Sequence, residues 1–473
     1  PRMVRYEDPA FQASMKIKLD VSNMMQEVLG EKGFTAEQLQ DPIFAKAAAQ
    51  MTAQKKNMGF RQLPYTDPAL LDEILQTAAE IREKFEAFVI LGIGGSALGP
   101  IAVQQALNHL RYNELPAEKR GGPRFYVEDN IDPARMEALF DVIDVKKTCF
   151  NVITKSGSTS ETMAQFLIIA DKLKQAGVPL KENMIATTDK EKGNLIKIAR
   201  QEGLKTFIIP DGVGGRFTEL TPVGLLGAAV CGIDIKEMIA GARYMDQMLE
   251  SENVMENMAY LDGALQYLCM ENGINISVMI PYADTLKYMS DWYAQLWAES
   301  LGKNITRDGK PVHVGQTPVK ALGVTDQHSQ VQLYTEGPFD KVVTFLAVGD
   351  YGPVVDIPHG FEDVPDVAFL GGHTMNELIS AEQFATAYAL NRAKRLNKTF
   401  TLPEVNAFTV GQLLYVLEVE TAFLGELYNI NAFDQPGVEE GKNAAYALLG
   451  KNGYDAKREE MDNAPKPVAK YIL

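Results

Sequence analysis

Short apolar runs alternate with longer stretches of mixed polarity along most of this chain, beginning near residue 85. Each run is about as long as a strand whose two faces are both buried. The strand candidates are 88–91, 125–127, 149–153, 184–187 and 206–209. Stretches between them repeat their apolar residues with the period of an amphipathic helix, over 132–142, 162–174 and 194–200. This alternation predicts a doubly wound α/β domain around a parallel sheet.

The alternation returns in the second half of the chain. Strand candidates lie at 276–280 and 342–348, and a long helix is predicted over 286–301. Thr374-Met-Asn-Glu377 has the spacing of a capping box, which predicts another helix start. We therefore expect, in order, a helical arm, a first α/β domain, a helical bridge, a second α/β domain and a helical extension. Their expected bounds are 1–55, 56–232, 233–257, 258–405 and 406–473.

The charge of the chain limits its partners. Its 473 residues include 62 acidic and 46 basic side chains, so the formal net charge is −16. Nucleic acid and anionic membrane surfaces prefer a basic protein, so neither is expected as a partner. An anionic substrate would have to be bound by a local cluster of Lys or Arg.

The cysteines and the apolar runs bear on the location of the protein. Cys149, Cys231 and Cys269 are scattered and odd in number, which indicates buried thiols in a reducing compartment. No uninterrupted apolar run reaches the ~20 residues of a membrane span, and Pro1-Arg-Met-Val-Arg5 does not open a signal peptide. We therefore expect a soluble cytoplasmic protein.

Two segments rich in glycine and hydroxyl groups stand where a predicted strand turns into a helix. They are Val89-Ile-Leu-Gly-Ile-Gly-Gly-Ser-Ala-Leu-Gly99 and Ile153-Thr-Lys-Ser-Gly-Ser-Thr-Ser-Glu-Thr162. Free N–H groups and hydroxyls at a helix N-terminus bind anions, because the helix dipole favours negative charge there. Ser156, Thr159 and Thr162 can direct hydroxyls at one phosphate, although such residues also act as simple helix caps.

The first segment also fits the dinucleotide pattern G-x-G-x-x-G/A, in Gly92-Ile-Gly-Gly-Ser-Ala97. A dinucleotide domain requires an acidic residue ~20 positions later to bind a ribose. Here the next strand ends at Glu128-Asp129, well beyond that spacing. The hydroxyl-rich second segment therefore favours a phosphorylated small molecule, with a dehydrogenase and a ligand-free turn as alternatives.

Arg216 and Glu299 are candidates for chemistry on such a substrate. Arg216 lies in Asp211-Gly-Val-Gly-Gly-Arg-Phe-Thr218, directly after a predicted strand, where sites of α/β proteins form. Glu299 continues the apolar stripe of its predicted helix through Trp292 and Leu296. A carboxylate there needs a partner or a purpose, such as that of a general base. The alternatives are a surface arginine and a glutamate that bends out to water.

His328 and Lys442 are two further candidates. His328 is one of five histidines and lies in a polar segment, Thr325-Asp-Gln-His-Ser-Gln330. Lys442 shares a helix face with Val438 and Leu449, so it either extends along apolar surface to water or reaches into a site. A lone histidine is commonly a bystander, so neither residue identifies a reaction by itself.

Taken together, these segments resemble the glucose-6-phosphate isomerase family over most of the chain. Residues 211–224 are similar to the first signature of that family, and residues 425–442 to its second. Gly94-Gly-Ser96, Lys155-Ser156, Glu299-Ser-Leu-Gly-Lys303 and Gln327-His328 occur in the expected order. The resemblance implies two flavodoxin-like, doubly wound sugar-isomerase (SIS) domains. It also implies reversible conversion of glucose 6-phosphate to fructose 6-phosphate without a metal or organic cofactor.

The resemblance implies a role for each candidate residue. His328, helped by Lys442, would open the sugar ring, and Glu299 would then move a proton between C1 and C2 through a cis-enediol. Arg216 would stabilise the enediolate oxygen. The phosphate would be bound by Ser156, Thr159 and Thr162, with Lys155 and Ser96 nearby, and the sugar hydroxyls would be oriented by Gly95, Gln295 and Gln435.

The resemblance further implies a homodimer, because the family's histidine comes from the neighbouring subunit. The sugar phosphate would be its small-molecule partner. Gly157 departs from longer relatives, which carry an aromatic residue there. The alternative function is a non-catalytic sugar-phosphate-binding regulator on the same domains, which would not need Glu299, His328 and Lys442 together.

Overall fold

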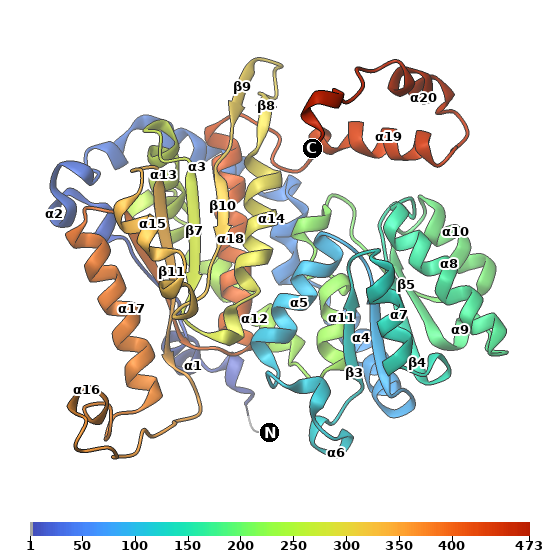
Figure 1. The fold of residues 1–473 in the computed structure, drawn as a ribbon, viewed down its shortest axis with the longest axis horizontal. Helices are drawn as coiled ribbons and strands as arrows, with labels where there is room; N and C mark the ends of the chain where they lie inside the picture. The colour runs from blue at the N-terminus through green and yellow to red at the C-terminus, as the bar shows by residue number, and fades with distance from the viewer. Residues whose placement is uncertain (1–2) are drawn as a thin grey trace.

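Two five-stranded sheets lie side by side in the computed structural model, which describes residues 3–473 (Figure 1). The first sheet is entirely parallel, in the order β3-β2-β4-β5-β6. Its strands are β2 (Ala87–Leu91), β3 (Arg124–Glu128), β4 (Thr148–Ile153), β5 (Met184–Thr188) and β6 (Lys205–Ile208). Counted along the chain, this is the flavodoxin-like order 2-1-3-4-5. Each predicted strand is confirmed to within one residue at either end.

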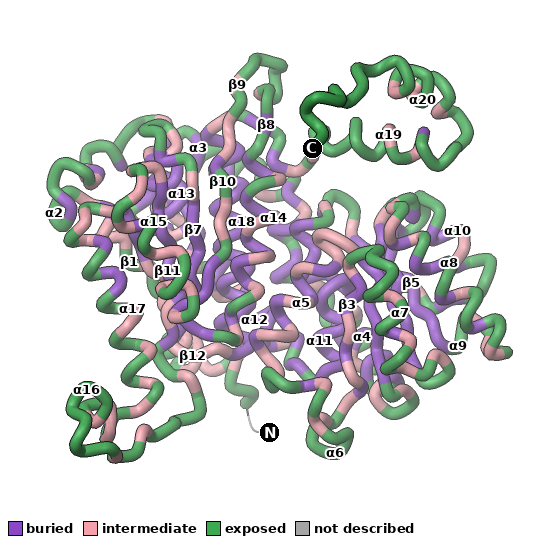
Figure 2. The backbone as a smooth tube through the Cα atoms, in the orientation of Figure 1, coloured by how far each residue is buried: buried purple, intermediate pink, exposed green. Residues whose placement is uncertain are grey.

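Helices cover both faces of this sheet (Figure 1). They are α4 (Pro68–Lys84), α5 (Gly95–Leu107), α6 (Ala117–Arg120), α7 (Pro133–Val142), α8 (Ser160–Gln175), α9 (Leu180–Asn183), α10 (Asn194–Glu202) and α11 (Pro222–Val230). The carboxylates of Asp67 and Asp132 cap α4 and α7, each with a proline as the first helical residue. Strands β2 and β4 are buried along their whole length because helices lie on both sides (Figure 2).

The second sheet has the order β1-β12-β11-β7-β10. Its parallel strands are β7 (Ile276–Pro281), β10 (Thr317–Lys320), β11 (Lys341–Asp350) and β12 (Asn397–Glu404). The fifth position is taken by β1 (Lys18–Asp20), which runs antiparallel to β12 with Leu19 opposite Phe400. The N-terminal arm was expected to be helical throughout. This expectation was wrong for β1, because this part of the arm covers the open edge of β12.

The helices of the second half confirm the predicted pattern, with one difference in capping. They are α13 (Met258–Glu271), α14 (Met289–Leu301), α15 (Val331–Glu336), α16 (Pro365–Ala368) and α17 (Met375–Arg392), and a hairpin of β8 (Lys303–Ile305) and β9 (Pro311–Val314) follows α14. Thr374 caps α17 by accepting from the Glu377 N–H at 3.0 Å. The Glu377 carboxylate bonds His373 Nδ1 instead, so only half of the expected capping box forms. A full capping box, Asn406 with Thr409, begins α18 (Ala407–Leu427).

Helix α18 is the centre of the molecule, and all its residues are buried. It packs against α3 (Pro42–Gln54), α12 (Ile235–Met248), α13 and α14. By length and composition α18 could cross a membrane, which the sequence analysis did not anticipate, but its apolar surface is covered by these helices. The rest of the arm includes α1 (Pro9–Ser14) and α2 (Gln26–Leu29).

The expected C-terminal extension consists of two different parts. Helix α18 belongs to the core, whereas α19 (Glu439–Leu448) and α20 (Asp455–Asp462) form a separate lobe, residues 436–473, beside the first half (Figures 1 and 2). This C-terminal lobe is mostly exposed, including Leu449 and Tyr471.

The expectation of buried cysteines is confirmed, since Cys149, Cys231 and Cys269 are free and buried, and burial raises the pKa of Cys149 to about 12.

Candidate active site

A hollow of about 890 Å³ lies where the first sheet meets α14 and the start of the C-terminal lobe. Its floor is formed by the loops at the carboxyl ends of β2, β4, β5 and β6. Strand order reverses between β2 and β4, and ligands of doubly wound sheets bind at such a switch point. The two glycine- and hydroxyl-rich segments follow these two strands and lead into α5 and α8.

The loop 154–159 after β4 has a fixed shape. Thr154 Oγ1 lies 3.0 Å from Thr159 Oγ1 and accepts from the Gly157 N–H at 3.2 Å. The Asn194 N–H donates to the Ser156 carbonyl at 2.9 Å. Gly157 has φ +69°, and a Cβ there would lie 2.1 Å from Leu195 N. The glycine thus allows this loop to pack directly on the start of α10, where any larger side chain would collide with the backbone.

Thr162 lies in the first turn of α8 and lines the hollow. Its side chain is buried, and its Oγ1 has no hydrogen-bond partner among the residues that the structure describes. An unpartnered buried hydroxyl costs about 1–3 kcal/mol. Because this oxygen is buried, a ligand in the hollow can bond it only if the loop after β4 or the start of α8 moves.

Arg216 connects α14 with the segment that leads to the C-terminal lobe. Its Nε donates to Ser300 Oγ at 2.7 Å, and its Nη1 donates to Glu299 Oε2 at 3.2 Å and to Gln435 Oε1 at 3.0 Å. Its Nη2 donates to the carbonyls of Ala432 and Asp434. Burial lowers the pKa of Arg216 from its ordinary value, against the opposing charges of Glu299 and Asp434. The guanidinium is therefore a fixed cation at the wall of the hollow.

Arg216 is brought to this place by the close approach of two motifs. A Cβ at Gly95 would lie only 2.0 Å from the Gly215 carbonyl oxygen, so the start of α5 packs directly on the loop after β6. No residue other than glycine fits there without movement of the backbone. The glycine loop and the arginine loop are therefore parts of one site.

Glu299 is in the last turn of α14, at the boundary between core and hollow. Trp292 and Leu296 on the same stripe are buried, whereas the Glu299 side chain is 34% exposed. Besides Arg216, its carboxylate contacts Gln295 Nε2 at 3.4 Å. Glu299 thus has a charged partner and still faces the hollow, so it does not bend away into bulk water.

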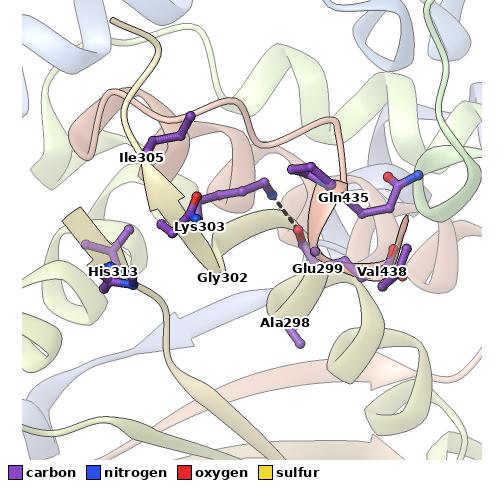
Figure 3. A pocket seen from close by; sticks show the side chains of 12 residues that line it. Ala298, Glu299, Gly302, Lys303, Ile305, His313, Gln435 and Val438 are labelled. Atoms are coloured by element: carbon purple, nitrogen blue, oxygen red, sulfur yellow. Dashed lines mark hydrogen bonds between the residues drawn. The ribbon is translucent and has the colours of Figure 1, made fainter. Parts of the chain in front are cut away.

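A second cavity of about 850 Å³ lies beside Glu299 and the hairpin β8–β9 (Figure 3). Glu299, Lys303, His313, Gln435 and Val438 contribute to its lining. The Lys303 side chain extends to the backbone of Glu299, and its Nζ donates to that carbonyl at 2.6 Å (Figure 3). Glu299 therefore lines both cavities, and Lys303 bonds its backbone carbonyl.

Lys442 reaches the hollow from α19 of the C-terminal lobe. Its Nζ lies 3.5 Å from Glu439 Oε1. The helix face that it shares with Val438 and Leu449 is exposed and not part of a core. Lys155, from the loop after β4, donates to the Val213 carbonyl at 3.3 Å. Two lysines from distant parts of the chain thus stand at the same hollow.

The hollow is lined by eleven of the twelve residues singled out from the sequence, namely Gly95, Ser96, Lys155, Ser156, Thr159, Thr162, Arg216, Gln295, Glu299, Gln435 and Lys442. His328 does not line it. This histidine ends a short 3-10 turn before α15 on the second half, and its side chain is exposed.

The sequence analysis missed part of the lining. Thr154, Glu161, Lys192 and Asn194 also face the hollow. The last two belong to Asp189-Lys-Glu-Lys-Gly-Asn194, which follows β5 and ends at the first residue of α10. The same sequence of strand, glycine and helix that identified the first two loops therefore also marked this third one.

Two other kinds of ligand fit the site less well. Glu128, at the end of β3, is buried and paired with Arg135 Nε at 3.2 Å, so it does not face the hollow as a ribose-binding carboxylate would. Within residues 3–473, no group of three or more His, Cys, Asp or Glu side chains is arranged to hold a metal ion. The lysines, the arginine and the hydroxyls that line the hollow instead suit a small molecule whose only charged group is a phosphate.

Comparison with known proteins agrees with this site. The profile of the family described as "Phosphoglucose isomerase" matches residues 76–348 and 367–467. A glucose-6-phosphate isomerase of Carboxydothermus hydrogenoformans is 57% identical over 94% of this chain and 97% of its own. One from Rubrobacter xylanophilus is 44% identical over 93% and 99%. The crystal structure of a glucose-6-phosphate isomerase from Chlamydia trachomatis superposes with a TM-score of 0.70, at 25% identity, over 83% of this chain and 76% of that one.

The matched residues include both glycine-containing loops, Arg216, Glu299 and Lys442, so the similarity extends over the hollow as well as the two sheets. The family profile matches most of the chain, and two relatives are 44% and 57% identical to it over nearly their whole length. The chain belongs to the phosphoglucose isomerase family.

Proposed function

We propose that this chain, which interconverts glucose 6-phosphate and fructose 6-phosphate, does so in the hollow, with Glu299 as the base and a cis-enediol intermediate. One observation carries the proposal. The Arg216 guanidinium lies 3.2 Å from Glu299 Oε2, so a base and a fixed cation face the same cavity as the hydroxyl-rich loop. A non-catalytic regulator would need the loop but not this pair.

The pair suits proton transfer between adjacent sugar carbons. In the open-chain aldose, Glu299 takes the proton from C2, and the C–H electrons form the C1–C2 double bond while O1 gains the charge. The carbon proton then returns to C1, while the hydroxyl proton of O2 passes to O1, so that O2 becomes the ketone oxygen and O1 a hydroxyl. A positioned base contributes roughly 10²–10⁴-fold, and a preplaced cation such as Arg216 contributes about 3 kcal/mol more at the enediolate.

The phosphate holds the reacting carbons at Glu299. It carries a charge of about −1.5 to −2, and the loop after β4 offers N–H groups, hydroxyls and Lys155 at the start of α8. In our proposal Ser96, Ser156, Thr159 and Thr162 bind this group, whereas Gly95, Gln295 and Gln435 orient the sugar hydroxyls. Binding energy from the phosphate thereby positions C1 and C2.

Thr162→Val tests the phosphate role. If Thr162 Oγ1 bonds the phosphate, the substitution raises the KM for fructose 6-phosphate about tenfold and leaves kcat within about twofold, because only binding is lost. Since the hydroxyl has no partner among residues 3–473, the free energy of unfolding stays equal or rises. The matched control is Thr421→Val in α18, a buried helical threonine whose hydroxyl bonds the Leu417 carbonyl. An unchanged KM in Thr162→Val would remove this residue from the phosphate site.

We further propose that His328 acts, with Lys442, in opening the sugar ring, in the active site of a second copy of the chain. Support comes from the exposure of His328 away from its own hollow. Further support comes from apolar side chains exposed on the segment 354–388, which a two-fold partner would cover. They are Val354, Val355, Phe361, Val364, Val367, Phe369, Met375, Leu378, Phe384 and Tyr388. The free and buried thiols favour a reducing, cytoplasmic location.

Mixing two inactive variants tests the shared site. Glu299→Gln and His328→Ala homodimers should each have little activity. After unfolding and refolding together, random pairing should restore about a quarter of native activity, because half of the dimers then contain one site with both native residues. Refolding each variant alone is the control. Failure to gain activity on mixing, with both variants dimeric, would show that His328 and Glu299 do not act in one site shared between two subunits.

A further inference from the structure

We infer that Lys303 is a positioning residue for the isomerisation, which fixes the last turn of α14 and thereby aims the Glu299 carboxylate. The inference rests on the proposed role of Glu299 as the base. Lys303 itself does not line the sugar hollow. Lys303 lines the second cavity instead, and from there its side chain reaches the backbone of Glu299 (Figure 3).

The contacts of Lys303 are those of a helix C-cap made by a side chain. Its Nζ donates to the carbonyls of Glu299 at 2.6 Å and Ser300 at 3.0 Å. Both carbonyls belong to the last turn of α14, where no helical N–H remains to bond them. A cation at this end also complements the helix dipole. Because the Lys303 side chain is only 7% exposed, water cannot readily replace it.

Lys303 also joins α14 to the segment before the C-terminal lobe. Its Nζ lies 3.8 Å from Asp434 Oδ1, while Arg216 bonds the Asp434 carbonyl and Gln435. Two cations therefore hold residues 434–435 against the helix that carries Glu299. The same segment continues to Lys442, so a shift of the helix end would disturb both sides of the hollow.

The ionisation of Lys303 gives this role a measurable signature. Burial and the neighbouring Arg216 lower the pKa of Lys303 to about 8, against the opposing charges of Asp434 and Glu299. His313 on β9 lines the same cavity. Because the pKa is lowered, Lys303 loses its charge above about pH 8, and the kcat of the native enzyme should fall above that pH. We call this fall the alkaline limb of the pH profile. A variant without an ionisable group at 303 should lack it.

Lys303→Met is the direct test. Its kcat should fall roughly 10- to 100-fold, as expected when a catalytic group is displaced by about 1 Å, and its alkaline limb should be absent. The KM and the inhibition constant of inorganic phosphate should stay within about threefold, because the phosphate loop is untouched. The matched control is Lys310→Met on the same hairpin, an exposed lysine paired with Asp308, which should behave like the native enzyme.

The inference would be overturned if Lys303→Met kept a kcat within about twofold of native. It would also be overturned if phosphate inhibition weakened by the same factor as kcat. Failure of the inference is distinguishable from failure of the proposed base, because Glu299→Gln would then still be inactive. If Lys303→Met does not fold, Asp434→Asn provides the second test. Asp434 is half-exposed and raises the pKa of Lys303, so its loss should move the alkaline limb of kcat to lower pH. No movement, or movement to higher pH, would also overturn it.

Discussion

Glu299→Gln is expected to lower kcat at least a hundredfold, with the KM for fructose 6-phosphate changed by less than about threefold. The amide has the shape of the carboxylate and can still accept from Arg216 Nη1, so the hollow keeps its walls. It cannot accept a proton from carbon. Steady-state kinetics in both directions, with exchange of the substrate C2 proton for solvent deuterium followed by NMR, measures the loss of the proton-transfer step itself.

The control for this variant is Glu202→Gln, at the last residue of α10, an exposed glutamate outside the hollow. It should retain native kinetics. Turnover of Glu299→Gln near the native rate, or proton exchange that survives while net conversion stops, would show that another group abstracts the proton.

Arg216→Met should lower kcat/KM about 10²- to 10³-fold. A methionine fills the space of the side chain but supplies no charge to the enediolate and leaves Ser300, Ala432 and Asp434 without their donor. Two effects are therefore combined, loss of stabilisation of the intermediate and release of the segment that leads to Lys442. Kinetics together with thermal unfolding separates them, because only the second lowers the unfolding temperature.

Arg216→Lys is the matched comparison for this prediction. Lysine keeps the positive charge but lacks the planar group that reaches both α14 and residues 432–435. It should recover part of kcat while remaining impaired in stability, so that charge and bridging are distinguished. A loss of less than about tenfold in Arg216→Met would argue against a role in the intermediate.

Local pattern was sufficient to predict most of the elements of the two sheets. The strands of the first sheet were found because each contains a short run of mostly apolar residues, a property that depends only on near neighbours in the sequence. The anion-binding loops were recognised for the same reason, since glycine, hydroxyl residues and a helix start are adjacent there. Lys192 was missed because its loop is rich in charge and poor in hydroxyls, although it follows the same strand-to-helix pattern.

Pattern failed where an element's environment is supplied by distant residues. The three residues of β1 carry too weak an alternation to predict a strand, and they pair only because β12 offers an open edge. Helix α18 looks like part of an extension until α12, α13 and α14 are packed around it. The capping box predicted for α17 forms only in part, because the Glu377 carboxylate bonds His373 instead of the backbone of Thr374.

The amino-acid order alone established the class of fold, the anion-binding loops and the family resemblance, since these depend on residues close together in the chain. Folding was required to bring Arg216 within 3.2 Å of Glu299, to set Lys303 behind that base and to leave His328 outside its own hollow. Such distances arise from packing between elements far apart in sequence. No local pattern contains them, because they depend on the angles at which whole helices and sheets meet.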